Sequence, residues 1–348
     1  MKIYLVDNAN DGHHKVYQDT LNKINNTQIL NKIIKFTDLK ENFIKAYKER
    51  STFFKYVNSK TNKGDIIHLL YIDSLYKCPL IDKKLNRDKK YIGTLHWVPK
   101  DAFRQNLLKR FSKKIELIIV HSEFLEEELN KIGIKNVKTI EYPSFININN
   151  KNIKKDKELK DKIVISCLGG TRKDKGLDIL SEAFKFIDSK CKEKIVFNIC
   201  GIEQDIKYDD IMMSAKENNI DVICKNKFLT EQEYEEEIYK TDVILLPYRK
   251  IFSGNSGPMT DGIYANKFIL GPNEGNLGFL INKYQLGDTF VQEDYKDLAK
   301  KISEINKLNL NKEHEYRDRL KSVNFLNLHA EIYNKIKNFY MDKKEVNN

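Results

Sequence analysis

The chain has 348 residues, of which 41% are hydrophobic, and its formal net charge is +11. This length suits two domains, and the hydrophobic content excludes a wholly disordered chain. No apolar run approaches the roughly eighteen residues that a membrane-spanning helix needs, and no export signal opens the chain, so we expect a cytoplasmic protein. The lysines are spread throughout without a nucleic-acid-binding pattern. The charge therefore favours peripheral contact with an anionic membrane at its inner face over a nucleic-acid partner.

The five cysteines are widely spaced and form no CxxC pair. Several of them lie in apolar, strand-like runs. We expect buried free thiols in a reducing compartment. The residues are Cys78, Cys167, Cys191, Cys200 and Cys224.

In the first part of the chain, short β-type runs alternate with helical stretches, which is typical of parallel sheets covered by helices. This pattern predicts a first Rossmann-like domain over residues 1–148. The expected strands are residues 2–6, 65–70, 91–95, 117–121 and 137–141, and the expected helices include residues 105–112 and 123–131.

Residues 149–162 are mostly Asn, Lys, Asp and Glu, which is the composition of a linker. A second alternating series then predicts another Rossmann-like domain over residues 163–324. From residue 311 onward apolar residues recur at helical spacing, and residues 325–348 are expected to form a C-terminal helix. Two doubly wound domains in tandem would place a ligand in the cleft between the carboxyl ends of their strands. The expected strands of the second domain are residues 163–168, 195–200, 221–224, 243–247 and 267–270, and its expected helices are residues 177–185, 230–239 and 297–307.

The strongest candidate segment begins where an apolar strand ends in Gly169 and Gly170. A helix follows near Gly176, and Arg172 and Lys175 occupy the loop between them. Glycine backbone, a helix N-terminus and two cations suit a diphosphate. In so basic a chain the loop could equally be an ordinary strand-to-helix connection with solvated charges, and the spacing alone does not decide.

A second segment follows the strand that ends at Pro247. The run Ser253–Gly257 opens a helix with Pro258 in its first turn. Glycines and hydroxyl groups at a helix N-terminus can form an anion-binding nest. Ser256 could instead serve only as the helix N-cap.

Two segments of the first domain follow strands and should face the same cleft. His96 and Trp97 could bind or stack on a sugar, although a lone His is more often a hydrogen-bonded structural residue. The loop after the first strand contains Gly12, His13 and His14, where acceptor or phosphate contact is plausible. No third ligand accompanies the paired histidines, and the chain has no Asp-x-Asp pair, so no metal is expected.

Together these segments resemble the retaining GT-B glycosyltransferases of the group 1, or family 4, kind. The similarity runs in order over most of the chain and includes the family signature Gly-x-x-Arg-x-x-Lys-Gly-x-x-x-Leu-x-x-Ala-Phe. The matching segments are Leu117–Leu129, Gly169–Phe184, Phe197–Gly201, Lys227–Pro247 and Ser256-Gly257.

The resemblance implies roles for single residues. Arg172 and Lys175 would hold the donor diphosphate, the loop near Phe228 would frame the base, and His96 would lie near the sugar. The C-terminal helix would return to the first domain. The implied catalytic residues are His96, Arg172 and Lys175; the donor-binding residues are Gly170, Thr171, Phe228, Asn255, Ser256, Gly257, Asp261 and Glu274; the acceptor-binding residues are Gly12, His13 and Trp97.

The chain departs from the family in one respect. Many members carry two glutamates, seven residues apart, in the phosphate-facing helix and the loop after it, whereas here the nearest acids are Asp261 and Glu274. The implied function is metal-independent, retaining transfer of a sugar from a nucleoside-diphosphate sugar, UDP- or GDP-linked, to a glycan or lipid-linked acceptor in surface polysaccharide or glycoconjugate biosynthesis. The missing glutamates motivate an alternative, a non-catalytic GT-B-fold subunit that partners an active transferase. Epimerisation of a sugar nucleotide is a third hypothesis.

Overall fold

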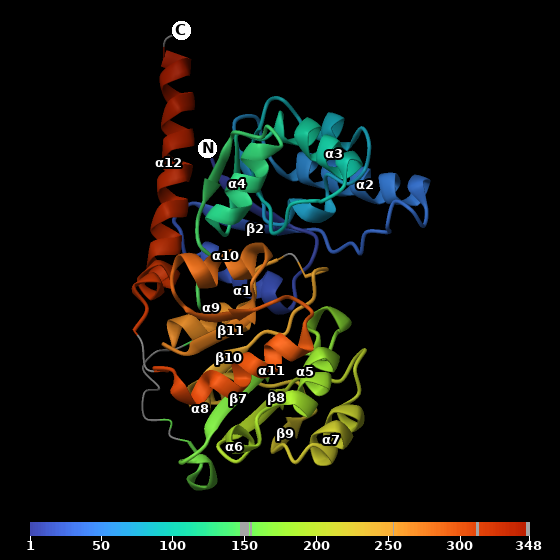
Figure 1. Cartoon of the computed structure of the whole chain (residues 1–348). Coiled ribbons are helices and arrows are strands. Elements are labelled where there is room, and N and C mark those ends of the chain that lie inside the picture. Colours follow the sequence, from blue (N-terminus) through green and yellow to red (C-terminus); the bar gives the residue numbers. More distant parts are fainter. Residues whose placement is uncertain (147–152, 154, 253, 311–312, 346–348) are drawn as a thin grey trace. The chain divides into compact units, whose positions relative to one another are not determined.

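The computed structural model describes residues 1–146, 153, 155–252, 254–310 and 313–345 (Figure 1). The chain forms two compact units. Unit 1 comprises Met1–Tyr142 together with Ser322–Asn348, and unit 2 comprises Pro143–Lys321. Most of the linker expected at residues 149–162 is described, but residues 149–152 and 154 lie outside the described part.

Unit 1 is built on six parallel strands in the order β2-β1-β3-β4-β5-β6. Its central strands are continuous apolar runs, such as Ile-Ile-His-Leu in β3, because helices cover both faces of a parallel sheet. The strands are β1 (Ile3–Asp7), β2 (Thr27–Asn31), β3 (Ile66–Leu69), β4 (Lys90–Thr94), β5 (Leu117–Val120) and β6 (Val137–Thr139), and the helices are α1 (Gly12–Leu21), α2 (Phe43–Lys60), α3 (Ala102–Ser112), α4 (Glu123–Lys131) and α12 (Ser322–Glu345), with the short 3₁₀ turns η1 (Ile72–Ser74) and η2 (Ile81–Lys84).

The C-terminal helix α12 is part of the core of unit 1. Phe325, Ile332 and Tyr333 pack in one buried cluster with Leu5 of β1 and Ile92 of β4. The helix also contacts α1. Polar groups fix it as well, because the Tyr333 hydroxyl lies 2.6 Å from Nδ1 of His68 on β3.

Unit 2 has a second six-stranded parallel sheet, in the order β12-β11-β10-β7-β8-β9. Buried residues from β7 and β8 and from helices α5, α7 and α11 form the core on one face, and α9 and α10 contribute to that on the other. The strands are β7 (Ile163–Leu168), β8 (Ile195–Cys200), β9 (Val222–Lys225), β10 (Val243–Leu245), β11 (Phe268–Pro272) and β12 (Gly287–Phe290), and the helices are α5 (Leu177–Ala183), α6 (Ser189–Lys192), α7 (Tyr208–Glu217), α8 (Glu231–Lys240), α9 (Gly257–Tyr264), α10 (Gly275–Lys283) and α11 (Tyr295–Glu304).

The predicted fold class, two doubly wound α/β domains, is confirmed, and the sequence missed elements mainly at the sheet edges. Strands β2 and β12 were not expected, because each is half-exposed and lacks a continuous apolar run. Helices α7 and α10 were also missed. In the tail, Glu315–Leu320 forms a 3₁₀ helix and the α-helix begins only at Ser322, while residues 311 and 312 lie outside the described part.

All five cysteines are free, and each except the half-buried Cys224 is buried. Within the part of the chain that the structure describes, none of the helices combines the length and apolar character that crossing a bilayer requires.

Candidate functional site

The sheet of unit 2 reverses its strand order between β7 and β10. From β7 the chain moves outward to β8 and β9, and from β10 it moves outward in the other direction to β11 and β12. The loops that follow the carboxyl ends of two such strands diverge and leave a crevice, which is where open α/β sheets bind ligands. These two loops contain the two strongest candidate segments of the sequence.

Direct contacts join the two loops. A Cβ atom on Gly176, whose φ is +65°, would lie 2.0 Å from the carbonyl oxygen of Pro247, so only glycine fits there. The Arg249 N–H donates a 3.0 Å hydrogen bond to the Asp174 carbonyl oxygen. The Arg249 guanidinium also pairs with the Asp178 carboxylate. The structure thus brings together segments that are some seventy residues apart, as the Lys175–Tyr248 separation of 73 residues shows.

Lys175 lies at this junction. Its ammonium group donates a 2.5 Å hydrogen bond to the Tyr248 hydroxyl and lies 3.9 Å from the centre of the Tyr248 ring. The Phe252 ring centre is 5.0 Å away. The Tyr248 hydroxyl is also 3.2 Å from Oγ of Ser256. No carboxylate pairs with Lys175 among the described residues, so this cation is held by neutral groups and can neutralise an anionic ligand.

Arg172 is placed differently. Its guanidinium forms a two-pronged ion pair with Asp174, with nitrogen–oxygen distances of 2.9 and 2.8 Å. The hydrogen bond to Asp174 raises the pKa of Arg172, and the side chain is 52% exposed. A diphosphate would therefore compete with Asp174 for this cation.

The loop after β7 owes its shape to glycines. Gly169 and Gly201 have φ values of +108° and +151°, and a Cβ on Gly201 would lie 2.1 Å from the Gly169 carbonyl oxygen. Gly170 touches the neighbouring loop, where a Cβ would lie 2.8 Å from Oε1 of Gln204. Thr171 is fully buried, and its hydroxyl donates a 2.6 Å hydrogen bond to the Ile206 carbonyl. Thr171 therefore anchors the loop, leaving backbone and the two cations to meet a ligand.

At the start of α9, Ser256 is the N-cap, because its Oγ accepts a 3.3 Å hydrogen bond from the Met259 N–H. Gly257 is the first helical residue. Asn255 accepts a 2.5 Å hydrogen bond from Asn276 of α10, while its own Nδ2 is buried without a partner among the described residues. Ser253 lies outside the described part. This helix start is thus tied to α10 and retains one unsatisfied donor.

The two acids and Phe228 are not drawn into this junction. The Asp261 carboxylate accepts hydrogen bonds from Ser144, at 2.7 Å, and from Tyr234, at 3.0 Å. Burial raises its pKa to about 6. Glu274 is exposed at the start of α10 without a side-chain capping bond, and Phe228, in the loop after β9, is 81% exposed.

Unit 1 has its own reversal of strand order, between β1 and β3. At the carboxyl ends of these strands, three rings form a stack. The Tyr71 ring lies between His14, at a centroid distance of 3.8 Å, and His96, at 4.1 Å with nearly parallel planes. Each imidazole is held by one carboxylate, since Nδ1 of His14 is 2.9 Å from Asp7 and Nδ1 of His96 is 2.9 Å from Asp73.

Asp73 fixes His96 firmly. Its carboxylate accepts hydrogen bonds from the His96 N–H, at 3.1 Å, and the Trp97 N–H, at 3.2 Å, besides binding the ring. This arrangement favours a proton on Nδ1 and leaves Nε2 as an acceptor. Nε2 of His96 is buried and has no hydrogen-bond partner among the described residues. A buried ring nitrogen without a partner is suited to a ligand hydroxyl.

The acceptor candidates are only partly brought together. Gly12 opens α1 with a φ of +47°, and the side chain of His13 lies outside the described part. The histidine in the ring stack is His14. The ammonium group of Lys77 lies over the Trp97 ring, 4.6 Å from the centre of that ring.

Sequence reasoning missed several residues of these two junctions: Asp7, Tyr71, Asp73, Tyr248 and Asn276. A signal existed for Asp7, a carboxylate at the very end of a buried strand. The pairing of Asp73 with His96 and of Tyr248 with Lys175 depends on strand adjacency, which the local sequence does not carry.

No group of three or more His, Cys, Asp or Glu side chains that could hold a metal ion is found among the described residues.

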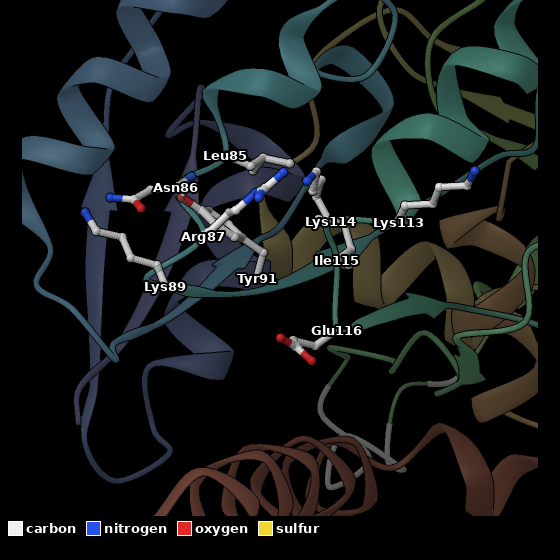
Figure 2. A pocket seen from close by; sticks show the side chains of 9 residues that line it. All are labelled: Leu85, Asn86, Arg87, Lys89, Tyr91, Lys113, Lys114, Ile115 and Glu116. Carbon is white, nitrogen blue, oxygen red and sulfur yellow. Dashed lines mark hydrogen bonds between the residues drawn. The ribbon is translucent and has the colours of Figure 1, made fainter. Parts of the chain in front are cut away.

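A pocket of about 210 Å³ lies at the other end of the unit 1 sheet, where β4 and β5 begin. In Figure 2 the head groups of Arg87 and Lys114 lie near each other, while Lys89 and Lys113 point away. Because it lies away from the carboxyl ends of the strands, this pocket is separate from both junctions.

No protein-family model matches the chain, and no curated protein matches it by sequence. Solved structures do match in fold. A sucrose-phosphate synthase from Thermosynechococcus elongatus has a TM-score of 0.72 at 13% identity, covering 97% of this chain and 99% of that one. Anabaena HepE in complex with UDP has a TM-score of 0.71 at 13% identity, covering 96% and 100%.

An α,α-trehalose-phosphate synthase (UDP-forming) from Burkholderia xenovorans, solved with glucose-6-phosphate, has a TM-score of 0.66 at 10% identity and covers 98% of this chain and 99% of that one. In each comparison the similarity extends over nearly the whole length of both chains. The chain therefore has the GT-B fold, with two Rossmann-like domains in tandem and a C-terminal helix that belongs to the first.

Proposed function

We propose that this protein transfers a sugar from a nucleoside-diphosphate sugar, UDP- or GDP-linked, to a glycan or lipid-linked acceptor in surface polysaccharide or glycoconjugate biosynthesis, with retention of configuration and without a metal ion. The observation that carries the proposal is the junction of unit 2, where Lys175 rests on Tyr248 between two glycine-shaped loops at the strand-order reversal. Two of the solved structures with this fold add support, since one contains UDP and another is described as UDP-forming.

Unit 2 would bind the donor. Lys175 is close to the N-terminus of α9 through the Tyr248–Ser256 contact, so a diphosphate there would meet an ammonium group and a helix N-terminus together. Arg172 would exchange Asp174 for the phosphate. As the bond between the sugar carbon and the phosphate oxygen breaks, these cations stabilise the charge that develops on the departing diphosphate.

Unit 1 would bind the sugar acceptor. The unpartnered Nε2 of His96 can accept a hydrogen bond from a sugar hydroxyl, and the Asp73 carboxylate keeps the ring in position to do so. In the transfer, the acceptor oxygen forms its bond to the sugar carbon on the face from which the diphosphate leaves. The released proton passes to the diphosphate. The protein's contribution is alignment and charge stabilisation.

The test is calorimetric titration of the full chain with UDP, GDP, CDP and ADP in the presence of EDTA. We expect micromolar binding of one diphosphate, abolished in the double variant Arg172→Ala with Lys175→Ala. Lys300→Ala, at an exposed position of α11, is the matched control for loss of positive charge in the same unit. Binding of none of the four by the wild type would refute the donor site.

The alternative, a non-catalytic subunit, draws support from Asp261. Its carboxylate is already engaged by Ser144 and Tyr234, so it is not available as a substitute for a family glutamate. Glu274 is exposed and remains a candidate ribose ligand. The alternative predicts that no diphosphate binds and that the protein is captured with a partner transferase. The same titration therefore separates the two functions.

A further inference from the structure

The net positive charge of the chain is concentrated in one segment of unit 1. Residues 40–114 contain 19 lysines and arginines and 7 acidic residues, whereas the whole chain contains 61 and 50. The excess within this segment is as large as the formal net charge of the whole chain, +11, so the remainder of the chain is close to neutral. A uniform bias towards lysine would spread the excess evenly, so this segment forms a surface with a charge of its own.

The segment builds one layer of unit 1, which consists of α2, η2 and α3 and is called the basic layer below. Buried residues of all three elements belong to one cluster on the sheet, whereas those of α1 and α12 belong to the cluster on its other face. The Phe54 ring of α2 and the Phe111 ring of α3 are 6.5 Å apart between centres. Arg110 of α3 lies 3.5 Å from the Asp82 carboxylate of η2. The three elements therefore form one continuous surface, in which α2 and α3 are neighbours (Figure 1).

Helix α2 presents cations to the solvent. Its buried positions include Phe53, Phe54 and Val57, which face the sheet. Lys48 and Lys55 are seven residues apart, which places them together on the opposite side of the helix, and both are exposed.

Few carboxylates offset the cations of the basic layer. Its three elements contain ten lysines and arginines but only two acids, Glu49 and Asp82. The Glu49 carboxylate accepts hydrogen bonds from the N–H and the hydroxyl of Thr37, at 2.7 and 3.0 Å, and Asp82 lies beside Arg110. A large positive excess remains after both acids are taken into account, so the layer attracts a partner that carries many negative charges.

Exposed apolar side chains lie at one end of the same layer. Ile44, in the first turn of α2, is 65% exposed, and Phe103, in the first turn of α3, is 56% exposed. Leu80, directly before η2, is also exposed and has a φ of +66°, which is uncommon for leucine. Phe103 lines the same depression as Leu39 and Lys40, which lie shortly before α2, so the starts of the two helices are close together. Cations beside exposed apolar side chains are typical of surfaces that lie on a membrane.

We propose that the basic layer binds the protein to a bilayer that contains anionic lipids, with Ile44 and Phe103 inserted among the headgroups. The lipid phosphates attract the cations of α2, η2 and α3, and the two apolar side chains leave water. A nucleic acid would match the charge, but its charged backbone offers the apolar side chains no comparable environment. The inference goes beyond the proposed function and does not depend on it. The starts of α2 and α3 lie at the edge of the sheet where the strands end, as His96 does, so under the proposed function the bilayer would lie beside the acceptor site.

The experiment is co-sedimentation of the full chain with vesicles of phosphatidylcholine, with and without phosphatidylglycerol, at low and at high salt. We expect binding to the anionic vesicles to be at least about tenfold tighter than to the neutral ones, and to weaken as salt is added. The double variant Lys48→Gln with Lys55→Gln should weaken it about twentyfold, because each cation near the surface contributes about fivefold. Lys216→Gln with Lys300→Gln removes two exposed cations from α7 and α11 of unit 2, and this matched control should bind like the wild type.

A second double variant tests the apolar part of the surface. Ile44→Ser with Phe103→Ser should weaken binding to the anionic vesicles about tenfold, because both side chains leave water on binding. Met213→Ser, at a position of α7 that is 59% exposed, is the matched control and should have no effect. A short DNA duplex is titrated as the probe for a nucleic-acid surface, and we expect it to bind more weakly than the anionic vesicles.

Two checks keep the test decisive. Thermal unfolding identifies a variant that is misfolded, and Lys60→Gln with Lys83→Gln, two more exposed positions of the basic layer, then replaces the first pair. Equal binding to both kinds of vesicle, an equal loss in the unit 2 control, or DNA bound as tightly as the anionic vesicles overturns the inference. Titration of the same samples with UDP and GDP tests the proposed function separately, because none of the substituted residues belongs to the proposed donor site.

Discussion

In unit 2 the loops at the strand-order reversal are shaped by glycines and carry the cations Arg172 and Lys175, whereas in unit 1 the same place in a similar doubly wound sheet holds imidazoles, a phenol and carboxylates. Gly176 lets one loop press against the next, and Lys175 lies beside the contact. In unit 1, Asp7 and Asp73 hold two imidazoles against Tyr71. Under the proposed function, the shared topology would fix where a ligand binds, and the side chains would fix whether that ligand is a diphosphate or a sugar hydroxyl.

The difference also concerns how each junction is held. The junction of unit 2 depends on the close approach of backbone segments, so added side-chain atoms should disrupt it. Unit 1 depends on polar rings that are oriented by the Asp7 and Asp73 carboxylates, so its junction is sensitive to the loss of those carboxylates. Four predictions test the two units separately.

The largest effect is expected for Gly176→Ala. The new Cβ would meet the Pro247 carbonyl oxygen at 2.0 Å in a backbone conformation with φ of +65°. We expect a loss of about 2–5 kcal/mol in the free energy of unfolding of unit 2, the sum of backbone strain and overpacking. Hydrogen exchange of the β7 and β10 amides measures it.

Gly275→Ala is the control for this substitution. Gly275 has nearly the same φ, +69°, but nothing lies within 4 Å of its Cβ position. It should cost only about 1–2 kcal/mol. Equal losses in the two variants would show that the steric contact between the loops is unimportant.

The second prediction concerns Asp261 of unit 2, whose pKa burial raises to about 6. Between pH 6 and about 4 the folded state binds a proton that the unfolded state does not, so the free energy of unfolding rises as the pH falls through this range. The full contribution is about 2–3 kcal/mol. Below pH 6 the dependence of the free energy of unfolding on pH should differ between the wild type and Asp261→Asn. Urea denaturation, monitored by hydrogen exchange in β11, measures both dependences. If the free energy of unfolding changed with pH in the same way in both proteins, the raised pKa of Asp261 would be contradicted.

Unit 1 should respond to acid in the opposite direction. Burial lowers the pKa of His329 to about 4 and that of His68 well below its usual value. Below pH 6.5 the unfolded state takes up protons that the folded state refuses, so stability falls, by about 1.4 kcal/mol per histidine at pH 5.5. Trp97 is the only tryptophan and lies in unit 1, so its fluorescence reports this transition in urea.

His329→Phe isolates one of these groups. The ring packs on Phe325 at 4.3 Å and its Nε2 is buried without a partner, so phenylalanine should fit. Between pH 7.5 and 5.5 the variant should lose about 1.4 kcal/mol less than the wild type. If the difference in free energy of unfolding between wild type and variant were the same at the two pH values, His329 would not change its protonation on unfolding.

The smallest effect is expected for Asp73→Asn. The amide keeps the size of the side chain but no longer favours the proton on Nδ1 of His96, so the free Nε2 acceptor is lost in part of the molecules. We expect sugar transfer to fall about tenfold in kcat with nucleotide affinity unchanged. Nitrogen NMR of the His96 ring should show a mixture of tautomers. An unaltered tautomer with reduced kcat would point to a different role for Asp73.

The sequence predicted the centre of the fold well, and the reason is burial on both faces. The strands Ile163–Leu168 and Ile195–Cys200 are unbroken apolar runs and have the predicted bounds. The edge strand Thr27–Asn31 has no such run. Its formation depends on the five residue pairs that it makes with β1, which the local sequence does not encode.

The residues of the candidate sites also differ in whether the local sequence could predict them. Gly169 to Gly176 could be singled out because a strand, a glycine loop and a helix follow one another in the chain. The partner of His96 could not, because Asp73 is 23 residues away and reaches it only through the adjacency of β3 and β4. Such partners become visible only once strand order is known.

The contribution of α12 to the core of unit 1 makes that unit discontinuous along the chain. Unit 2 is complete when the ribosome has added Lys321, but the cluster around Leu5 still lacks Phe325, Ile332 and Tyr333. The hydrogen bond between His68 and Tyr333 joins residues 265 positions apart. During synthesis unit 1 therefore stays incomplete until residues 322–345 emerge, although its first residues precede those of unit 2.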